Sequence, residues 1–263
     1  INKRVIYYFM IKKEKKIIGL IPTRIGSTRL PFKALLPING MPLIIHTYRR
    51  AKLSKKLTDV VICCDDLKIL KIAKKYKAKA ILTSKNHLNG SERICEAYYK
   101  LKKPYDFIID IQGDEPLISP FHIDQVINFH IKNYEADIVL PTLKVTSLNN
   151  PNIVKVVTNV NNEVLYLSRN QIPYEFKRKN KFLKKHLSII SFKPLALKKF
   201  SVHKPTHLEK IEDIELLRAL EIGLKIKTIN LSGDSFSIDV LEDYKKAQKK
   251  MLKDKFFKMY DEN

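Results

Sequence analysis

Short apolar segments alternate with longer amphipathic segments through the first half of the chain. The apolar segments are rich in β-branched residues, have the length of buried strands, and lie near residues 17–22, 59–64, 79–83, 106–111 and 137–145. The segments between them carry apolar residues at three- and four-residue spacings, which predicts helices at about 42–54, 67–77, 90–102 and 121–133. This alternation is typical of βαβ units, so we predict an α/β fold with a mixed, mostly parallel sheet.

The pattern changes after Asn150. Two strand-like runs between residues 153 and 168 flank the segment Asn159 to Asn162, a turn signal that predicts a hairpin in a small antiparallel lobe at about 150–200. The basic stretch Phe176 to Lys185 is predicted to be a mobile loop. The remaining predicted elements are a strand near 186–192, a helix near 209–222, a strand near 225–231 and a last helix from about 240.

The length and composition of the chain indicate one globular domain. Its 263 residues, 44% of them apolar, are enough to bury a full-sized core, which we place at residues 17–263. The longest apolar runs have strand length and fall far short of the roughly 20 residues that span a bilayer, so we expect no membrane segment. Residues 1–16 are predicted to be a flexible N-terminal extension. Ile1 to Phe9 precede Met10 and a lysine-rich run, which suggests a leader, an upstream reading-frame extension or a tag remnant.

The cysteines bear on the compartment of the protein. Cys63, Cys64 and Cys95 are odd in number and lack the spacing of metal ligands, and the first two lie in a predicted strand. Buried, reduced thiols are the simplest interpretation. We therefore expect a cytoplasmic protein.

The net charge of +23, from 50 Lys and Arg against 27 Asp and Glu, raises the possibility of a nucleic-acid-binding protein. The lysines are dispersed over most predicted helices, which favours a solvated basic surface over a nucleic-acid site. A basic nucleic-acid-binding protein remains the alternative from a different class. In either case the positive field attracts anionic substrates.

The loop after the first predicted strand has the composition of an anion-binding site. Gly26 allows a phosphate to approach the backbone closely, and Arg24, Arg29 and Lys33 supply three cations within ten residues. The loop is neither a Walker A motif nor a Gly-rich dinucleotide turn. An ordinary exposed basic loop is the alternative, but ligands of open α/β sheets bind beyond the carboxyl ends of strands, where this loop lies. We therefore predict that it holds a triphosphate.

Two aspartates are candidates for binding a metal ion. Asp114 follows the strand predicted at 106–111, where a single carboxylate can bind a Mg²⁺ ion that also contacts phosphate oxygens. Asp239 precedes the last predicted helix. The structural alternatives are that Asp114 opens a turn before Pro116, and that Asp239 caps the helix with Glu242 completing a capping box.

Several motifs together resemble one enzyme family. The segment Ile21 to Lys33, the segment Leu36 to His46, the sequence Gln-Gly-Asp-Glu-Pro at 112–116 and Asp-Val-Leu-Glu-Asp at 239–243 resemble the 3-deoxy-manno-octulosonate (Kdo) cytidylyltransferases, or CMP-Kdo synthetases. The resemblance extends over residues 17–249. It implies a Rossmann-like nucleotide-sugar transferase fold whose antiparallel lobe forms a homodimer contact.

The resemblance also implies a reaction and a set of site residues. The reaction is transfer of CMP from CTP to Kdo, with release of pyrophosphate, for lipopolysaccharide synthesis, and its cofactor is Mg²⁺ held by Asp114 and Asp239. These two residues, with Arg24 and Lys33, are the implied catalytic residues. The implied nucleotide-binding residues are Pro22, Arg24, Ser27, Arg29, Lys33, Ser84, Asn89, Gly90 and Arg93, and the implied sugar-binding residues are Gln112, Arg169, His186 and Glu215. The alternative for the segment from Ser84 to Arg93 is a well-capped helix start without a binding role.

Some positions depart from the usual family pattern. Phe32 stands where the family has a glycine before the lysine, and Asn89 and Ser91 replace a serine and a threonine. Ile190 and Leu216 stand where the family has tyrosine and glutamine, so polar groups expected near the sugar are replaced by aliphatic ones. A modified Kdo or another acidic sugar is therefore the alternative substrate.

Overall fold

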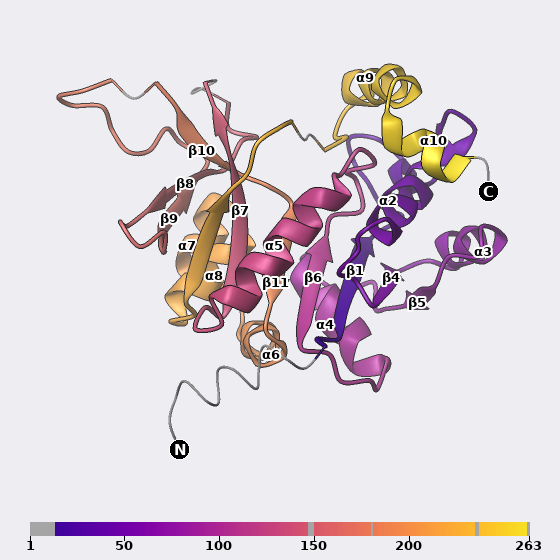
Figure 1. The fold of residues 1–263 in the computed structure, drawn as a ribbon, viewed down its shortest axis with the longest axis horizontal. Coiled ribbons are helices and arrows are strands. Elements are labelled where there is room, and N and C mark those ends of the chain that lie inside the picture. The colour runs from indigo at the N-terminus through magenta and orange to yellow at the C-terminus, as the bar shows by residue number, and fades with distance from the viewer. Residues whose placement is uncertain (1–13, 147–149, 180, 235–236, 262–263) are drawn as a thin grey trace.

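A ten-stranded mixed sheet forms the centre of the molecule (Figure 1). The computed structural model describes residues 14–146, 150–179, 181–234 and 237–261. The strands run in the order β5-β4-β1-β6-β11-β7-β10-β8-β9, and β12 also pairs with β7. The strands are β1 Ile17–Thr23, β4 Asp59–Cys64, β5 Ala80–Leu82, β6 Phe107–Ile111, β7 Ile138–Val145, β8 Lys155–Thr158, β9 Val164–Ser168, β10 Leu183–His186, β11 Ile189–Phe192 and β12 Ile226–Asn230.

Helices cover both faces of this sheet. The helices are α2 Leu43–Lys52, α3 Leu67–Lys75, α4 Gly90–Lys100, α5 Pro120–Lys132, α6 Pro194–Val202, α7 His207–Glu212, α8 Glu215–Glu221, α9 Leu241–Leu252 and α10 Lys255–Asp261. One apolar core joins the sheet to α2, α3, α5, α9 and α10, and a second core joins its other face to α4, α6 and α8. A short 3-10 helix, η1 Lys33–Leu35, and a two-stranded hairpin of β2 Pro37–Ile38 and β3 Met41–Pro42 precede α2. None of the helices in the described ranges is long and apolar enough to cross a membrane.

The strand β1 lies at the centre of the parallel part of the sheet. It pairs in parallel with β4 and β6, and β4 pairs in parallel with β5. Ile17 and Ile21 of β1 face one core while Ile18 and Leu20 face the other, which explains why its sequence is continuously apolar. The predicted βαβ pattern is confirmed. Because these strands are parallel, the loops after β1, β5 and β6 meet at one edge of the sheet.

The predicted hairpin is confirmed as β8 and β9. The Asn159 side-chain oxygen accepts hydrogen bonds of 2.9 Å from the backbone of Asn161 and of Glu163, and Asn162 adopts a left-handed conformation with φ of 60°. The hairpin pairs with β10, and β10 pairs with β7. The antiparallel lobe therefore continues the main sheet.

The prediction of one strand at 186–192 is wrong, because two strands, β10 and β11, cover this region. Leu187 and Ser188 separate β10 from β11, and the Leu187 backbone N–H donates to the Pro141 carbonyl at 3.0 Å. β10 also includes the last residues of the loop predicted at 176–185, since Leu183 is buried and pairs with Val145 of β7. Polar lysines in β10 hid this strand from the hydrophobic pattern.

Three helix predictions need correction. The helix predicted at 209–222 is divided into α7 and α8 by Asp213, whose φ of 52° ends a right-handed helix. The last helix is likewise divided into α9 and α10. Helix α6 was not predicted, because Leu195 and Val202 are exposed and obscure its buried stripe.

The predicted N-terminal extension lies mostly outside the described residues, which begin at Glu14. The last residues of the extension contact the domain. The Lys15 ammonium pairs with Asp106 at 3.3 Å, and the Lys16 backbone N–H donates to the same carboxylate at 2.9 Å.

Candidate active site

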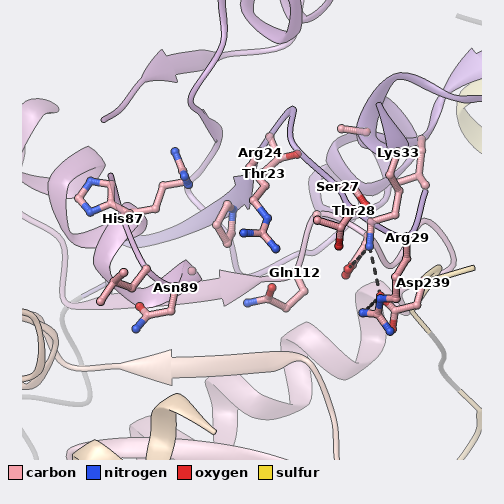
Figure 2. Close-up of a pocket in the computed structure, with 18 residues that line it drawn as sticks. Thr23, Arg24, Ser27, Thr28, Arg29, Lys33, His87, Asn89, Gln112 and Asp239 are labelled. Atoms are coloured by element: carbon pink, nitrogen blue, oxygen red, sulfur yellow. Dashed lines mark hydrogen bonds and ion pairs between the residues drawn. The ribbon is translucent and has the colours of Figure 1, made fainter. Parts of the chain in front are cut away.

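The loops that meet at the carboxyl edge of β1, β5 and β6 enclose a cavity of about 290 Å³. In Figure 2, Arg24 lies between a group formed by Arg29, Lys33 and Asp239 and a second group formed by His87 and Asn89. The residues predicted from the sequence that line this cavity are Pro22, Arg24, Ser27, Arg29, Lys33, Asn89, Gly90, Arg93, Gln112, Asp114 and Asp239. Segments more than 200 residues apart in the chain are thus brought together.

The loop after β1, which carries Arg24, Arg29 and Lys33, is anchored at its start. The Ile25 backbone N–H donates to Asp65, which follows β4, at 2.9 Å. This bond fixes the loop against the neighbouring strand. Arg24 is exposed at the cavity and forms no ion pair within the described part of the chain. Its guanidinium is therefore available to an anionic ligand.

Four charged side chains form a network at one end of this cavity. The Lys33 Nζ lies 2.7 Å from the Asp114 carboxylate and 3.4 Å from the Asp239 carboxylate, and Arg29 pairs with Asp239 at 2.9 Å. The backbone supports this contact, since the Ile238 N–H donates to the Asp114 carbonyl at 3.0 Å. The two predicted metal carboxylates therefore converge on one cation.

The alternative prediction that Asp239 caps the last helix is wrong. The N-cap of α9 is Val240, and Asp243 accepts hydrogen bonds from the backbone N–H groups of Asp239 and Val240 at 3.1 and 3.2 Å. Asp243 therefore satisfies the start of the helix, a role expected for Glu242. The carboxylate of Asp239 is left to face Arg29 and Lys33.

Two glycines permit the close packing of the three loops. A Cβ atom on Gly113 would lie 2.6 Å from the Pro22 carbonyl oxygen, and one on Gly90 would lie 3.1 Å from the Gln112 Nε2. The first distance is incompatible with any side chain unless the backbone moves. The ends of β1 and β6 are therefore held together by the absence of a side chain at Gly113.

The segment before α4 caps this helix and also lines the cavity. Asn89 is the N-cap and accepts a hydrogen bond from the Glu92 N–H at 2.9 Å. Arg93 is buried and donates to the Thr83 hydroxyl at 2.8 Å and to the Ser84 carbonyl at 3.0 Å. The capped helix start is thus confirmed. Ser84 is the one predicted nucleotide-binding residue that does not line the cavity.

His87 also lines this cavity, although it is not among the binding residues predicted from the sequence. Its Nε2 contacts the Glu96 carboxylate of α4. The available sequence signal was its position inside the segment from Ser84 to Arg93.

A second cavity, of about 590 Å³, adjoins the first. The two share Leu88, Asn89, Gly90, Gln112 and Asp114 as lining residues. The predicted sugar-binding residues Gln112, His186 and Glu215 line the second cavity. A ligand in the second cavity would therefore meet a ligand in the first beside Asp114.

Arg169 is not brought to either of these cavities. It lines a separate hollow together with Lys155 and Glu212. Its guanidinium donates to the backbone carbonyls of Glu212 at 2.7 Å and of Asp213 at 2.8 Å. The role of Arg169 in binding the sugar stays a prediction.

Burial shifts the pKa values of three groups in and near the second cavity. Burial raises the pKa of Glu215 to about 7 and lowers the pKa of His186 to about 4. Burial and then the nearby Glu215 carboxyl raise the pKa of Asp110 well above its ordinary value. Asp110 is a fully buried residue of β6 for which no motif in the sequence indicated a role. The signal for it was a charged residue inside an apolar strand.

Ile190 and Leu216, the two aliphatic residues that replace polar ones of the family, lie in different surroundings. Ile190 lines the second cavity, and its Cα is paired with that of Asp110 across β11 and β6. Leu216 does not line this cavity but is buried in the core beneath α8. Of these two replacements, only Ile190 therefore alters the wall of the second cavity relative to the usual family pattern.

Phe32 adopts a left-handed conformation with φ of 54°. Its ring is half exposed and lies 5.2 Å from the Lys68 ammonium. A glycine adopts this conformation without strain, which explains the glycine expected at this position.

The two carboxylates that converge on Lys33 fit a divalent cation. Mg²⁺ is commonly bound by one or two carboxylates together with the phosphates of a substrate. No group of three His, Cys, Asp or Glu side chains suited to a metal occurs within the described residues, so a metal ion here would also need ligands from the nucleotide.

The α/β sheet, the cation-lined cavity at its strand ends and the adjoining acidic cavity define a nucleotidyltransferase. A family model described as Cytidylyltransferase matches residues 18–226. The 3-deoxy-manno-octulosonate cytidylyltransferase of Thermodesulfovibrio yellowstonii is 41% identical over 88% of this chain and 96% of its own. The 8-amino-3,8-dideoxy-manno-octulosonate cytidylyltransferase of Shewanella baltica is 38% identical over 89% of this chain and 98% of its own.

A solved structure of a CMP:2-keto-3-deoxy-manno-octonic acid synthetase complexed with CTP has a TM-score of 0.86 and 29% identity, and covers 90% of this chain and 99% of its own. The chain belongs to the 3-deoxy-manno-octulosonate cytidylyltransferase family.

Proposed function

We propose that this enzyme transfers CMP from CTP to Kdo and releases pyrophosphate. The observation that carries the proposal is the pair of adjoining cavities, one lined by Arg24, Arg29 and Lys33 and the other by Gln112 and Glu215. CTP fits the first cavity because its triphosphate needs cations. The sugar fits the second because Gln112, His186 and Glu215 can form hydrogen bonds with its hydroxyls. The relatives named as Kdo cytidylyltransferases support this assignment.

The chemistry is an in-line displacement in which the anomeric hydroxyl of the sugar acid attacks the α-phosphorus of CTP. Arg24, Arg29 and Lys33 neutralise the charge that develops on the leaving pyrophosphate. Of these three cations, Lys33 is the only one that contacts both Asp114 and Asp239 in the described chain.

Asp114 and Asp239 would hold a Mg²⁺ ion in this enzyme. The bound ion would supply Lewis acidity toward the phosphate oxygens and the attacking hydroxyl. Asp114 lines both cavities, so its carboxylate lies where the nucleotide and the sugar would meet.

Pyrophosphate release from CTP in the presence of Mg²⁺ and Kdo tests the proposal. Wild-type enzyme is expected to turn over, and Asp114→Ala is expected to lose activity by about 100-fold or more. Asp106→Asn is the control, because this residue lies at the opposite end of β6 and binds Lys15 and Lys16. If no sugar acid supports pyrophosphate release, the proposed reaction is wrong.

The same proposal includes the setting of the enzyme. We infer a cytoplasmic homodimer that contributes to lipopolysaccharide synthesis, with the antiparallel strands β8 to β10 at the dimer contact. The three cysteines are free and buried, which suits a reducing compartment. Light scattering tests the dimer, which would have twice the chain mass of 30.7 kDa.

A further inference from the structure

Among the described residues, one lysine and four carboxylates line the second cavity. The lysine is Lys210, and the carboxylates are Asp114, Glu209, Asp213 and Glu215. His186 adds no positive charge to this cavity at neutral pH, because burial lowers its pKa to about 4. The proposed substrate is a sugar acid, whose carboxylate needs a cationic partner when it is taken out of water. The cation expected from the sequence, Arg169, lines a separate hollow and donates to backbone carbonyls there.

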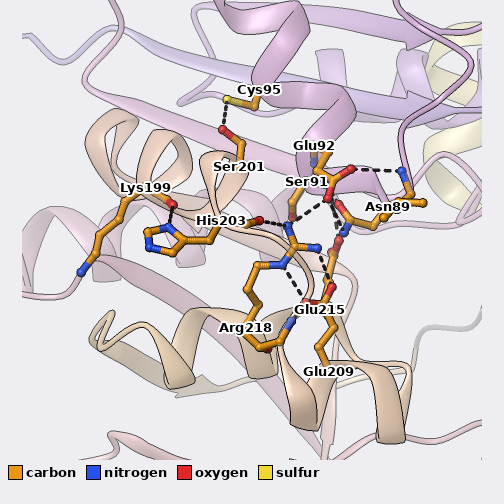
Figure 3. A network of polar contacts seen from close by, with 12 residues as sticks. Asn89, Ser91, Glu92, Cys95, Lys199, Ser201, His203, Glu209, Glu215 and Arg218 are labelled. Atoms are coloured by element: carbon orange, nitrogen blue, oxygen red, sulfur yellow. Dashed lines mark hydrogen bonds and ion pairs between the residues drawn. The ribbon is translucent and has the colours of Figure 1, made fainter.

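Two of the lining carboxylates already have cations of their own. Glu209 accepts hydrogen bonds from the Arg218 Nε at 2.7 Å and from its Nη2 at 2.6 Å, and Arg218 is fully buried. Figure 3 shows the Arg218 guanidinium turned toward Glu209. Asp114 pairs with Lys33 at 2.7 Å. Neither carboxylate therefore needs Lys210 as its partner.

The other two carboxylates repel an anionic ligand only weakly. Burial raises the pKa of Glu215 to about 7, so this side chain is partly protonated at neutral pH and can then donate a hydrogen bond. The side chain of Asp213 is 98% exposed and lies 3.6 Å from the Arg169 guanidinium, so solvent and a cation screen its charge. A carboxylate can therefore enter this cavity if Lys210 receives it.

Lys210 lies on a helix whose start is held in place. Glu209, the residue before it in α7, accepts a hydrogen bond from the Thr206 backbone N–H at 3.1 Å in addition to its pairing with Arg218. The side chain of Lys210 is exposed at the cavity, and it forms no ion pair and donates no hydrogen bond in the described part of the chain. Its three N–H donors are therefore available to a ligand.

We propose that Lys210 binds the carboxylate of the sugar acid and so selects an acidic sugar over a neutral one. A contact between an ammonium group and a carboxylate is a charge-assisted hydrogen bond, which is stronger than a hydrogen bond between neutral groups. Gln112 and His186, which line the same cavity, are left to bind the hydroxyls of this sugar. The inference rests on the proposed cytidylyl transfer and adds to it a residue that determines the sugar specificity.

The test compares kcat/KM for Kdo and for its 1-carboxamide, which has nearly the same shape and no charge, each with CTP and Mg²⁺. Wild-type enzyme is expected to prefer the acid by about tenfold or more. In Lys210→Gln this preference should fall to about threefold or less, while Lys210→Arg, which keeps the charge, should retain it. The KM for CTP should change by less than about twofold in both variants, because Lys210 does not line the first cavity.

Two further variants identify the source of the preference. Lys204→Gln is the matched control, because it removes the same charge from an exposed residue shortly before α7 that lines neither cavity. It should leave the preference for the acid unchanged. Arg169→Gln tests the role that the family resemblance implies for Arg169, and it should also leave the preference in place.

The outcomes separate the two proposals. Pyrophosphate release with neither sugar would refute the cytidylyl transfer, and the assignment of Lys210 with it. A preference for the acid that survives Lys210→Gln would leave the transfer standing and overturn the assignment. A preference lost in Arg169→Gln but not in Lys210→Gln would return the carboxylate to Arg169. An equal loss in Lys204→Gln and Lys210→Gln would also overturn the assignment, because the preference would then come from the general surface charge.

Discussion

Single residues in this enzyme carry conformational and electrostatic costs at particular places. Phe32 is held in a left-handed conformation directly before Lys33, where a side chain is strained. His130 is buried against β11 and stays neutral because burial lowers its pKa to about 4. Both costs are compensated by the surrounding fold, so both are measurable as changes in the free energy of unfolding.

Replacing Phe32 by glycine is expected to raise the free energy of unfolding by about 0.5 to 1 kcal/mol, because the strain of the left-handed residue is relieved. Phe32→Ala is the matched control, since it removes the ring and its contact with Lys68 but keeps the Cβ atom. Urea denaturation measures both variants. Equal stability of the glycine and alanine variants would show that φ at this position stores no strain.

The buried His130 is expected to make the free energy of unfolding depend on pH. Its Nδ1 lies 2.7 Å from the Ser191 hydroxyl, and its pKa of about 4 is below the ordinary value of 6.5. The unfolded chain therefore takes up the proton first, and stability is lost as the pH falls from 6.5 toward 4. Between pH 7 and pH 5 the wild type should lose roughly 2 kcal/mol more than His130→Gln. Parallel losses in the two proteins would contradict this assignment.

At the scale of elements, the active site depends on how closely β1 and β6 end beside each other. The Pro22 carbonyl after β1 occupies the space that a side chain on Gly113 would need. The same strand ends carry the cations of one loop and the carboxylate of Asp114. A shift between these strands therefore changes the contact of Lys33 with Asp114.

Gly113→Ala is expected to lower the free energy of unfolding by about 2 kcal/mol and kcat/KM by about tenfold or more, because the added methyl group overpacks the strand ends. Gly26→Ala is the control for stability, since no described atom lies within 4 Å of a Cβ at that position. Its stability should change by less than about 0.5 kcal/mol. A Gly113→Ala variant as stable as Gly26→Ala would show that the strands have room to separate.

At the scale of the whole molecule, a net charge of +23 surrounds a site for an anionic nucleotide. The positive field raises the local concentration of CTP and its rate of association. Salt screens this attraction, with a Debye length of about 10 Å at 0.1 M.

We therefore expect kcat/KM for CTP to fall several-fold as KCl rises from about 50 to about 500 mM, while kcat changes less. Steady-state kinetics with CTP as the varied substrate measures this effect. The uncharged osmolyte sucrose at matched osmolarity is the control. A kcat/KM that does not respond to salt would show that the basic surface does not steer the nucleotide.

The sequence by itself determined the strands of the parallel half, the hairpin around Asn161 and the loop that carries Arg24 and Lys33. These features are local, because apolar spacing and turn residues act over a few positions. They also place Asp114 at the end of a strand. Family motifs then added Asp239 and the sugar cavity residues His186 and Glu215.

Only the tertiary structure decided which distant groups meet. Asp110 of β6 and Glu215 of α8 are more than 100 positions apart in the chain, yet burial and then the Glu215 carboxyl raise the pKa of Asp110. Arg169 turns to backbone carbonyls because α7 ends beside it. Leu216 enters the core because α8 begins after the break at Asp213. Burial and charge pairing depend on these long-range contacts, which no local pattern of apolar and polar residues contains.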